Sequence, residues 1–236
     1  MVCEDFANQK VFGTPNEHFL PFLRDWKGLG NPFDIEPALA LGRNESGNTS
    51  VKIMSNYLRK MNAALSGGEE KPGLFPHVYE TFKDATWVFI SRRQKDRQAL
   101  SRITARNTGI YHFKTSKMPF KVGGAVADKD KIKQAEQLEY SDALRDEITQ
   151  TLAAIAQEEQ VWEDFFKAWD IKPFRIVYER VNRSTENYLK PLGKRLGYDL
   201  EDALPDRGIA KLPGKTSTQI IKAYRAEMEK ETSSAG

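Results

Sequence analysis

The sequence predicts an α/β protein with a small parallel sheet flanked by helices. The apolar run at 86–90 has the length of a strand buried on both faces, and a basic segment with a helical pattern follows it directly. A second strand-like run, at 172–178, comes after a long helical pattern at 128–168. Because helices separate the two runs, parallel pairing is the expected arrangement.

The first third of the chain predicts short elements around aromatic residues. Residues 1–12 have the pattern of the end of a helix, and a turn at 13–16 with a glycine and a proline ends it. Residues 19–37 are rich in aromatic residues, glycine and proline, so we expect an irregular stretch packed through its aromatic side chains. A short β-branched strand is expected at 50–54, and an amphipathic helix then runs to Leu65.

Helices dominate the rest of the chain. The basic segment after the first strand is closed by Gly109, which suits the end of a helix. Residues 128–168 place four aliphatic side chains on one helical face: Leu144, Ile148, Leu152 and Ile155. Regularly spaced leucines indicate a helix at 189–200, and a last helix is expected at 219–229. Residues 230–236 are expected to fray.

Composition excludes several classes of protein. The chain has 236 residues, and 36 Lys and Arg against 33 Asp and Glu give a formal net charge of +3, evenly spread along the sequence. This pattern does not favour a nucleic-acid partner. No apolar run approaches the roughly 20 residues of a membrane helix, and the N-terminus does not resemble a signal peptide. Cys3 is the only cysteine, so no disulfide can form within the chain. We expect one cytoplasmic domain over residues 1–236, without an integral membrane segment.

The junction between the first strand and its helix is the strongest candidate site. Four cations lie there: Arg92, Arg93, Lys95 and Arg97. The first backbone N–H groups of a helix have no partner within the helix, so the junction is suited to bind a phosphate group. Ser101, about two helical turns after Arg93, can add a hydroxyl donor. The alternative is that these cations only solvate a helix face and pair with nearby acids.

At this junction the residues resemble a known family. The stretch at 86–112 is similar to the strand and helix that bind the 3′-phosphate of the sulfuryl donor 3′-phosphoadenosine 5′-phosphosulfate (PAPS) in bacterial carbohydrate sulfotransferases typified by trehalose 2-sulfotransferase. The family pattern is an apolar strand, RRDK–RQAVS, an arginine and Thr-Gly; the corresponding residues here are 92–95, 97–101, Arg106 and Thr108-Gly109. Four further segments match in order: VFGTPNEHF at 11–19, SVKIM at 50–54, FRIVYERV at 174–181 and KAYRAEM at 222–228.

The resemblance implies a P-loop-NTPase-like sulfotransferase fold and transfer of a sulfuryl group from PAPS to a hydroxyl of a carbohydrate or glycolipid. It implies that Arg93 and Ser101 bind the donor's 3′-phosphate, and that Glu17 is the general base for the acceptor hydroxyl. Such in-line transfer depends on positioning and cations and requires no metal. Lys52 is a candidate electrostatic helper. Taken without the resemblance, Glu17 is a loop acid capping a backbone N–H and Lys52 a lysine facing solvent.

Two segments depart from the family pattern. The family begins with a strand and a loop, similar to TPRSGST, that binds the 5′-phosphosulfate, whereas Met1–Asp5 corresponds to a point inside the helix after that loop. We therefore expect a fold that lacks the usual first strand and loop, with 1–12 as the remainder of the first helix. At 209–218 the family tends to have Arg-Gln and Asp; here Lys215 is the candidate contact to a donor phosphate.

The missing loop leaves two functional interpretations open. The first is a PAPS-dependent sulfotransferase whose sequence here begins after its phosphosulfate loop. The second is a catalytically impaired, N-terminally truncated relative that binds a nucleotide or a partner protein. A nucleic-acid-binding module, supported only by the basic cluster at 92–106, is a weaker third interpretation. The identity of the acceptor is not predicted, and a homodimer is compatible with the resemblance.

Overall fold

The computed structural model describes residues 2–9, 11–26, 33–68, 74–109, 113–114, 137–181, 185–200, 209–210 and 215–234. Contacts between residues divide the chain into two compact units. The first unit holds Met1–Ser91 and Glu158–Asp206, and the second holds Arg92–Gln157 and Arg207–Gly236. One domain can contain two such units, so a single domain over residues 1–236 remains a prediction.

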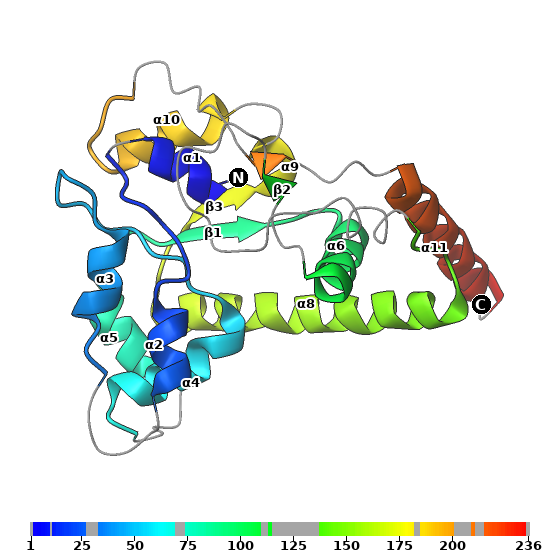
Figure 1. The fold of residues 1–236 in the computed structure, drawn as a ribbon, viewed down its shortest axis with the longest axis horizontal. Helices are drawn as coiled ribbons and strands as arrows, with labels where there is room; N and C mark the ends of the chain where they lie inside the picture. The colour runs from blue at the N-terminus through cyan, green and yellow to red at the C-terminus, as the bar shows by residue number, and fades with distance from the viewer. Residues whose placement is uncertain are drawn as a thin grey trace. The chain divides into compact units, whose positions relative to one another are not determined.

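The first unit combines short helices with two parallel strands (Figure 1). Its elements are α1 (Val2–Asn8), α2 (Phe19–Asp25), α3 (Glu36–Gly42), η1 (Ser55–Tyr57), α4 (Leu58–Leu65), α5 (Pro76–Phe82), β1 (Val88–Ser91), β3 (Phe174–Val177), α9 (Tyr178–Val181) and α10 (Glu186–Arg195). The last residues of the long helix α8 (Asp142–Ala168), from Glu158 on, also belong to this unit.

Strands β1 and β3 pair in parallel, with Val88 opposite Phe174 and Ser91 opposite Val177. This pairing confirms the predicted α/β class, although a two-stranded sheet is too small to test a P-loop-like fold. One face of the sheet packs against α1 and α10, and the other packs against the end of α8, where Phe89 meets Phe166 edge to face at 5.6 Å. The expectation that the first strand is buried on both faces is wrong at its carboxyl end, because Ile90 is 43 % exposed.

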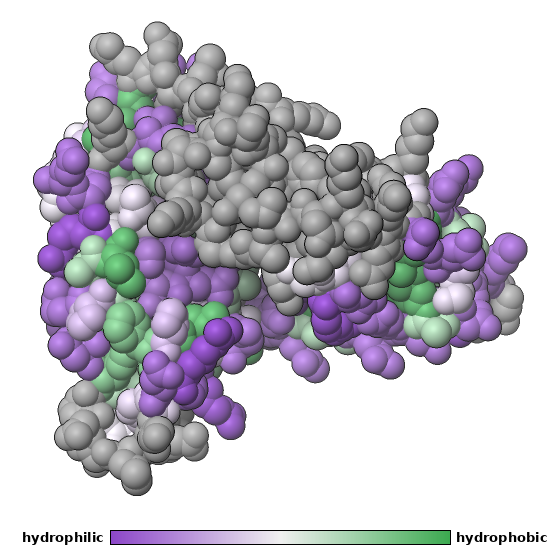
Figure 2. All heavy atoms as spheres, viewed as in Figure 1, coloured by the Kyte–Doolittle hydropathy of each residue, from purple (hydrophilic) through white to green (hydrophobic). Residues whose placement is uncertain are grey.

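Two hydrophobic clusters hold the first unit together. The larger one joins α2, α4, α5 and the end of α8 through fully buried side chains: Phe19, Leu23, Leu58, Met61, Val78 and Phe165. The smaller one joins α1, β3 and α10: Phe6, Ile176, Tyr188, Leu189 and Leu192. Figure 2 shows apolar areas interspersed with hydrophilic ones in the region of α2 and α3, where Leu41 is 55 % exposed.

Two predictions for the first third of the chain are wrong. The stretch at 19–37 is not wholly irregular, because α2 and the beginning of α3 lie in it. Their prolines stand in the first helical turn, where the missing N–H costs no hydrogen bond. The strand expected at 50–54 does not form; only Thr49 makes an isolated bridge, to Arg43. The backbone N–H groups of Ser50 and Lys52 instead donate to the carbonyls of Gly42 and Asn16.

The second unit consists of helices and one short strand pair. Its elements are α6 (Lys95–Thr108), β2 (Phe113–Lys114), α8 up to Gln157, β4 (Ile209–Ala210) and α11 (Lys215–Ser234). Strands β2 and β4 are antiparallel, with Phe113 opposite Ala210. The helices share one core: Ala99, Leu100 and Ile103 of α6, Leu144, Ile148 and Ile155 of α8, and Ile220, Ile221 and Tyr224 of α11.

The helix boundaries of the second half refine the predictions. The helix before Gly109 is confirmed, and so is the apolar face of the long helix, whose described part begins at Asp142. Residues 128–136 of that prediction lie outside the described residues. Helix α10 begins at Glu186, before the predicted 189, and α11 runs to Ser234, into the residues expected to fray. Among the described residues, no helix is both long and apolar enough to cross a membrane.

Candidate functional site

The predicted base and its predicted helper lie in direct contact in the first unit. Lys52 Nζ donates a hydrogen bond to Glu17 Oε1 at 2.8 Å. The side chains are 32 % and 35 % exposed, for Glu17 and Lys52 respectively, so the pair is shielded on one side and reachable from solvent on the other. Glu17 is therefore not simply a cap for a backbone N–H, and Lys52 does not merely face solvent. The structure brings together two residues that the sequence singled out separately.

Backbone hydrogen bonds tie the loop that carries Glu17 to the segment that carries Lys52. Thr14 N–H and Ser50 N–H both donate to the carbonyl of Gly42, at 3.0 and 3.1 Å. Lys52 N–H then donates to the carbonyl of Asn16 at 2.9 Å. These bonds place the two side chains by fixing their backbones first, so the ion pair does not depend on two flexible surface chains finding each other.

A glycine, Gly13, allows the backbone of its loop to lie close to the backbones of Gly42 and Ser50. Gly13 has a φ of +80°, in the left-handed region that other residues adopt at a cost. A Cβ at this position would lie 2.6 Å from the carbonyl oxygen of Gly42 and 2.9 Å from the backbone nitrogen of Ser50. The glycine of the GTPNEH segment is thus required by both conformation and space.

Further polar groups around the pair hold its parts in place. Asn16 Oδ1 accepts the N–H of Glu17 at 2.9 Å, and His18 Nε2 bonds to the carbonyl of Thr14 at 2.8 Å. The Tyr57 hydroxyl donates to the carbonyl of Lys52 at 2.7 Å. Burial raises the pKa of Tyr57, and the negative charge of Glu17 adds to the rise, so this phenol remains a hydrogen-bond donor. The contacts of Asn16 and Tyr57 were not predicted, because hydrogen bonds between loops leave no periodic pattern in a sequence.

The single cysteine lies within the electrostatic reach of the same pair. Burial raises the pKa of the Cys3 thiol, while the positive charge of Lys52 opposes the rise. A thiol that stays protonated is a weak nucleophile. Cys3 is therefore poorly suited to act as a nucleophile.

The predicted donor-binding residues belong to the second unit. Arg93 is exposed in the turn before α6, and Ser101 is exposed on α6 itself. Gln94, the N-cap residue of this helix, makes no side-chain capping bond. Lys215 is the first residue of α11, but the structure describes only its backbone.

Some charges on α6 have structural partners, as the alternative interpretation expected. Arg106 pairs with Glu147 of α8, and Arg225 of α11 pairs with Asp96 at 2.5 Å. Arg97 reaches the hydroxyl of Thr218 at 3.5 Å. Although burial alone would raise it, the hydrogen bond from Arg225 holds the pKa of Asp96 below its usual range. Arg97 and Arg106 thus take part in packing α6 against its neighbours. Within the described part of the chain, no cluster of three metal-ligating side chains is present.

Comparison with protein families gives one match. A family model described as Stf0 sulphotransferase matches residues 32–227, which is more than half of the chain. The matched range contains Lys52, Arg93, Ser101 and Lys215, whereas Glu17 lies before it. No curated protein matches the chain. The family match therefore does not extend to Glu17, whose role stays a prediction.

Proposed function

Because the chain belongs to the Stf0 sulphotransferase family, the family of trehalose 2-sulfotransferase, we propose that it transfers a sulfuryl group from PAPS to a hydroxyl of a carbohydrate or glycolipid. The observation that carries the mechanism is the contact between Glu17 and Lys52. The family match supports sulfotransferase activity in general, and the donor, the acceptor class and the residue roles are our proposal.

The chemistry needs a base and a stabilised leaving group. The acceptor oxygen attacks sulfur and forms a new S–O bond, while the bond from sulfur to the donor's 5′-phosphate oxygen breaks and its electron pair leaves with adenosine 3′,5′-bisphosphate. The proton of the acceptor hydroxyl passes to Glu17. With Oε1 bound to Lys52, Oε2 is the oxygen left to accept that proton. No covalent enzyme intermediate is required, since positioning and cations supply the catalysis.

Lys52 has a positioning role in this scheme. Its ammonium holds the Glu17 carboxylate in one orientation, and its backbone is itself fixed by Asn16 and Tyr57. A carboxylate aligned in advance loses little entropy when the acceptor binds. In the second unit, the guanidinium fork of Arg93 and the hydroxyl of Ser101 are suited to a dianionic 3′-phosphate, with Lys215 as a further cation.

The donor assignment is tested by calorimetric titration of the whole chain with adenosine 3′,5′-bisphosphate. We expect saturable binding that Arg93→Ala weakens by about 10- to 100-fold, because a charged hydrogen bond to phosphate contributes about 1.5–3 kcal/mol. Arg59→Ala is the matched control, since Arg59 is an exposed arginine on α4 outside the proposed site. Equal effects of the two substitutions would remove Arg93 from the site. Binding without transfer from PAPS to any sugar tested would instead support a nucleotide-binding relative.

A further inference from the structure

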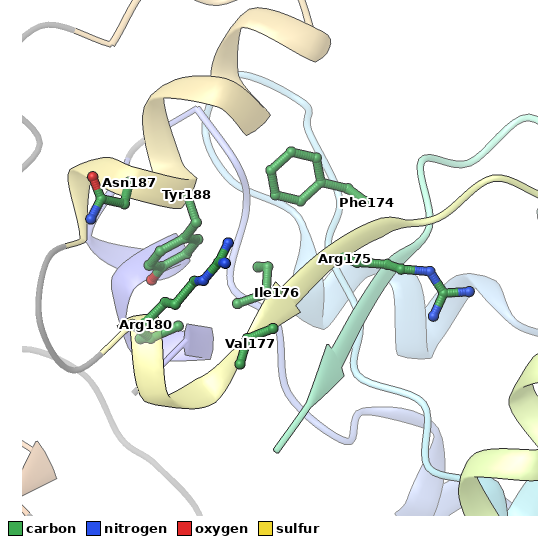
Figure 3. A pocket seen from close by; sticks show the side chains of 8 residues that line it. Phe174, Arg175, Ile176, Val177, Arg180, Asn187 and Tyr188 are labelled. Atoms are coloured by element: carbon green, nitrogen blue, oxygen red, sulfur yellow. The ribbon is translucent and has the colours of Figure 1, made fainter. Parts of the chain in front are cut away.

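A pocket of about 440 Å³ lies beside strand β3 in the first unit (Figure 3). It is lined by the strand residues Phe174–Val177, by Arg180 and Val181 of α9, and by Asn187 and Tyr188 of α10. None of the residues assigned to sulfuryl transfer lines it. Its volume is in the range of sites for small ligands, about 300–1,000 Å³.

The pocket follows an edge of β3 rather than one face of the sheet. All four strand residues line it, although neighbouring side chains of a strand point to opposite faces. Phe174 N–H donates to the carbonyl of Trp87 at 2.8 Å, on the side of β1. The backbone N–H of the next residue, Arg175, therefore turns to the other edge. Among the described residues, β1 is the only strand paired with β3, so this N–H is available to a ligand.

One cation, Arg180, points into this space, which is lined by apolar side chains and by the polar Asn187. In Figure 3 the guanidinium of Arg180 lies between the ring of Tyr188 and the side chain of Ile176. Within the part of the chain that the structure describes, no carboxylate pairs with Arg180. The side chain of Arg175 points away from the pocket, toward Glu163, to which it donates at 2.6 and 2.7 Å. The two arginines thus differ in that one has a structural partner and the other faces a cavity.

The walls around Arg180 are suited to an apolar body. Phe174 and Val177, both partly exposed, contribute hydrocarbon surface, whereas Ile176 and Val181 are themselves buried. The Tyr188 hydroxyl donates to the buried carboxylate of Asp5, which is not among the lining residues, so Tyr188 presents its ring to the pocket. A neutral polar ligand would leave the guanidinium without a counter-charge, and a purely ionic one would leave the apolar walls without contact.

We propose that this pocket binds an amphiphilic oxyanion, a carboxylate or sulfate carried on a short apolar chain. The guanidinium of Arg180 binds two oxygens of the headgroup, and the backbone N–H of Arg175 is the further donor at the strand edge. The apolar chain packs against the hydrocarbon walls and leaves water. This site is separate from the residues proposed for sulfuryl transfer, and it does not rest on that proposal.

Calorimetric titration of the whole chain with four probes tests this site. The probes are octanoate and octyl sulfate, both below their micelle-forming concentrations, with octan-1-ol and inorganic sulfate as controls that lack the charge or the chain. We expect at least one amphiphilic anion to bind about tenfold or more tighter than either control, and the preference between the two identifies the headgroup. Arg180→Gln should weaken this binding at least about tenfold, since it removes the charged hydrogen bonds.

Two further variants locate the binding. Lys172→Gln also removes one positive charge, two residues before the first lining residue of β3, but the exposed side chain of Lys172 does not line the pocket, so binding should be unchanged. Arg93→Ala should leave binding unchanged, which separates this pocket from the proposed donor site. Three results would overturn the proposal: no binding of either anion, equal binding of octan-1-ol, or equal binding by a folded Arg180→Gln variant. Loss of octyl sulfate binding in Arg93→Ala would assign the sulfate to the donor site and also overturn it.

Discussion

The two regions that hold the predicted functional residues are built in different ways. Around Glu17 and Lys52, segments 35 residues apart are joined by backbone hydrogen bonds, and the two side chains meet at 2.8 Å. Around Arg93 and Ser101, one turn and one helix carry both residues eight positions apart, and both side chains are exposed. One region is fixed by tertiary contacts, and the other is generated by local helix geometry.

This difference matches what the two proposed tasks demand. Proton transfer requires a base within hydrogen-bond reach of the acceptor, so a carboxylate held in one orientation favours it. Phosphate binding can use long exposed cations that close on the ligand, at the cost of their side-chain entropy. We therefore expect a rigid arrangement around Glu17, where the proton is transferred. Exposed side chains on one helix are sufficient around Arg93, where the donor is only bound.

The largest effect is expected when Glu17, the proposed base in the rigid region, is replaced. Glu17→Gln removes the proton acceptor but keeps the shape of the side chain and an oxygen for Lys52. We expect turnover to fall by about 10²- to 10⁴-fold, the usual contribution of a general base. Affinity for adenosine 3′,5′-bisphosphate should stay unchanged, because Glu17 is not proposed to contact the donor. Transfer of radiolabelled sulfate from PAPS to sugars measures the first quantity, and calorimetry measures the second.

A substitution at another acidic residue is the control for Glu17→Gln. Glu45 is an exposed carboxylate in a loop of the same unit, and Glu45→Gln should leave both turnover and donor affinity unchanged. Turnover retained in Glu17→Gln would exclude Glu17 as the base. A parallel loss of donor binding in Glu17→Gln would point to a disturbed fold rather than to missing proton transfer.

A smaller effect is expected when the close contact of Gly13 with the backbones of Gly42 and Ser50 is disturbed. This contact supports the pair of Glu17 and Lys52. Gly13 and Gly47 have nearly the same φ, +80° and +81°, but a Cβ on Gly47 would meet nothing within 4 Å. Gly47→Ala should lower the free energy of unfolding by about 1 kcal/mol, the cost of left-handed backbone alone. Gly13→Ala should lower it by about 3 kcal/mol, because the Gly42 and Ser50 backbones must also move. Urea unfolding measures both, and equal losses would show that this packing is not tight.

Local sequence patterns predict the structure around Arg93 and Ser101. They predict the structure around Glu17 and Lys52 only in part. The strand, turn and helix from Val88 to Thr108 follow from a β-branched apolar run, a polar junction and a closing glycine, all adjacent in sequence. Glu17 and Lys52 were each identified through similarity of their segments, but their contact could not be predicted. It depends on a loop crossing at Gly13 and Gly42, and such crossings leave no periodic signal in the chain.

The same reasoning explains the incorrect strand at 50–54. Its β-branched residues favour an extended backbone, and that preference is local. Pairing in a sheet needs a neighbouring strand, and here the N–H groups of Ser50 and Lys52 are taken by the carbonyls of Gly42 and Asn16. The residues that prevent a strand are thus the ones that position the proposed base.

The smallest expected effect concerns how the locally built region is anchored. Asp96, in the first turn of α6, accepts a hydrogen bond from Arg225 of α11, and this contact outweighs burial in lowering the pKa of Asp96. A carboxyl group with a lowered folded-state pKa adds stability above its unfolded pKa, about 3.9, and that stability is lost as the pH falls through the folded value. Because Arg225 is half exposed, the contribution at neutral pH should be about 1 kcal/mol or less.

Urea unfolding between pH 2 and 7 tests this anchor. In the unaltered chain, part of the decline in unfolding free energy below about pH 4 should come from Asp96. Asp96→Asn should make the decline shallower, and Arg225→Gln should do the same by removing the partner that lowers the pKa. The double variant should add little to either, because both substitutions remove one shared interaction. Additive effects of the two substitutions would mean that Asp96 and Arg225 act independently, and the contact between them would then not anchor α6 to α11.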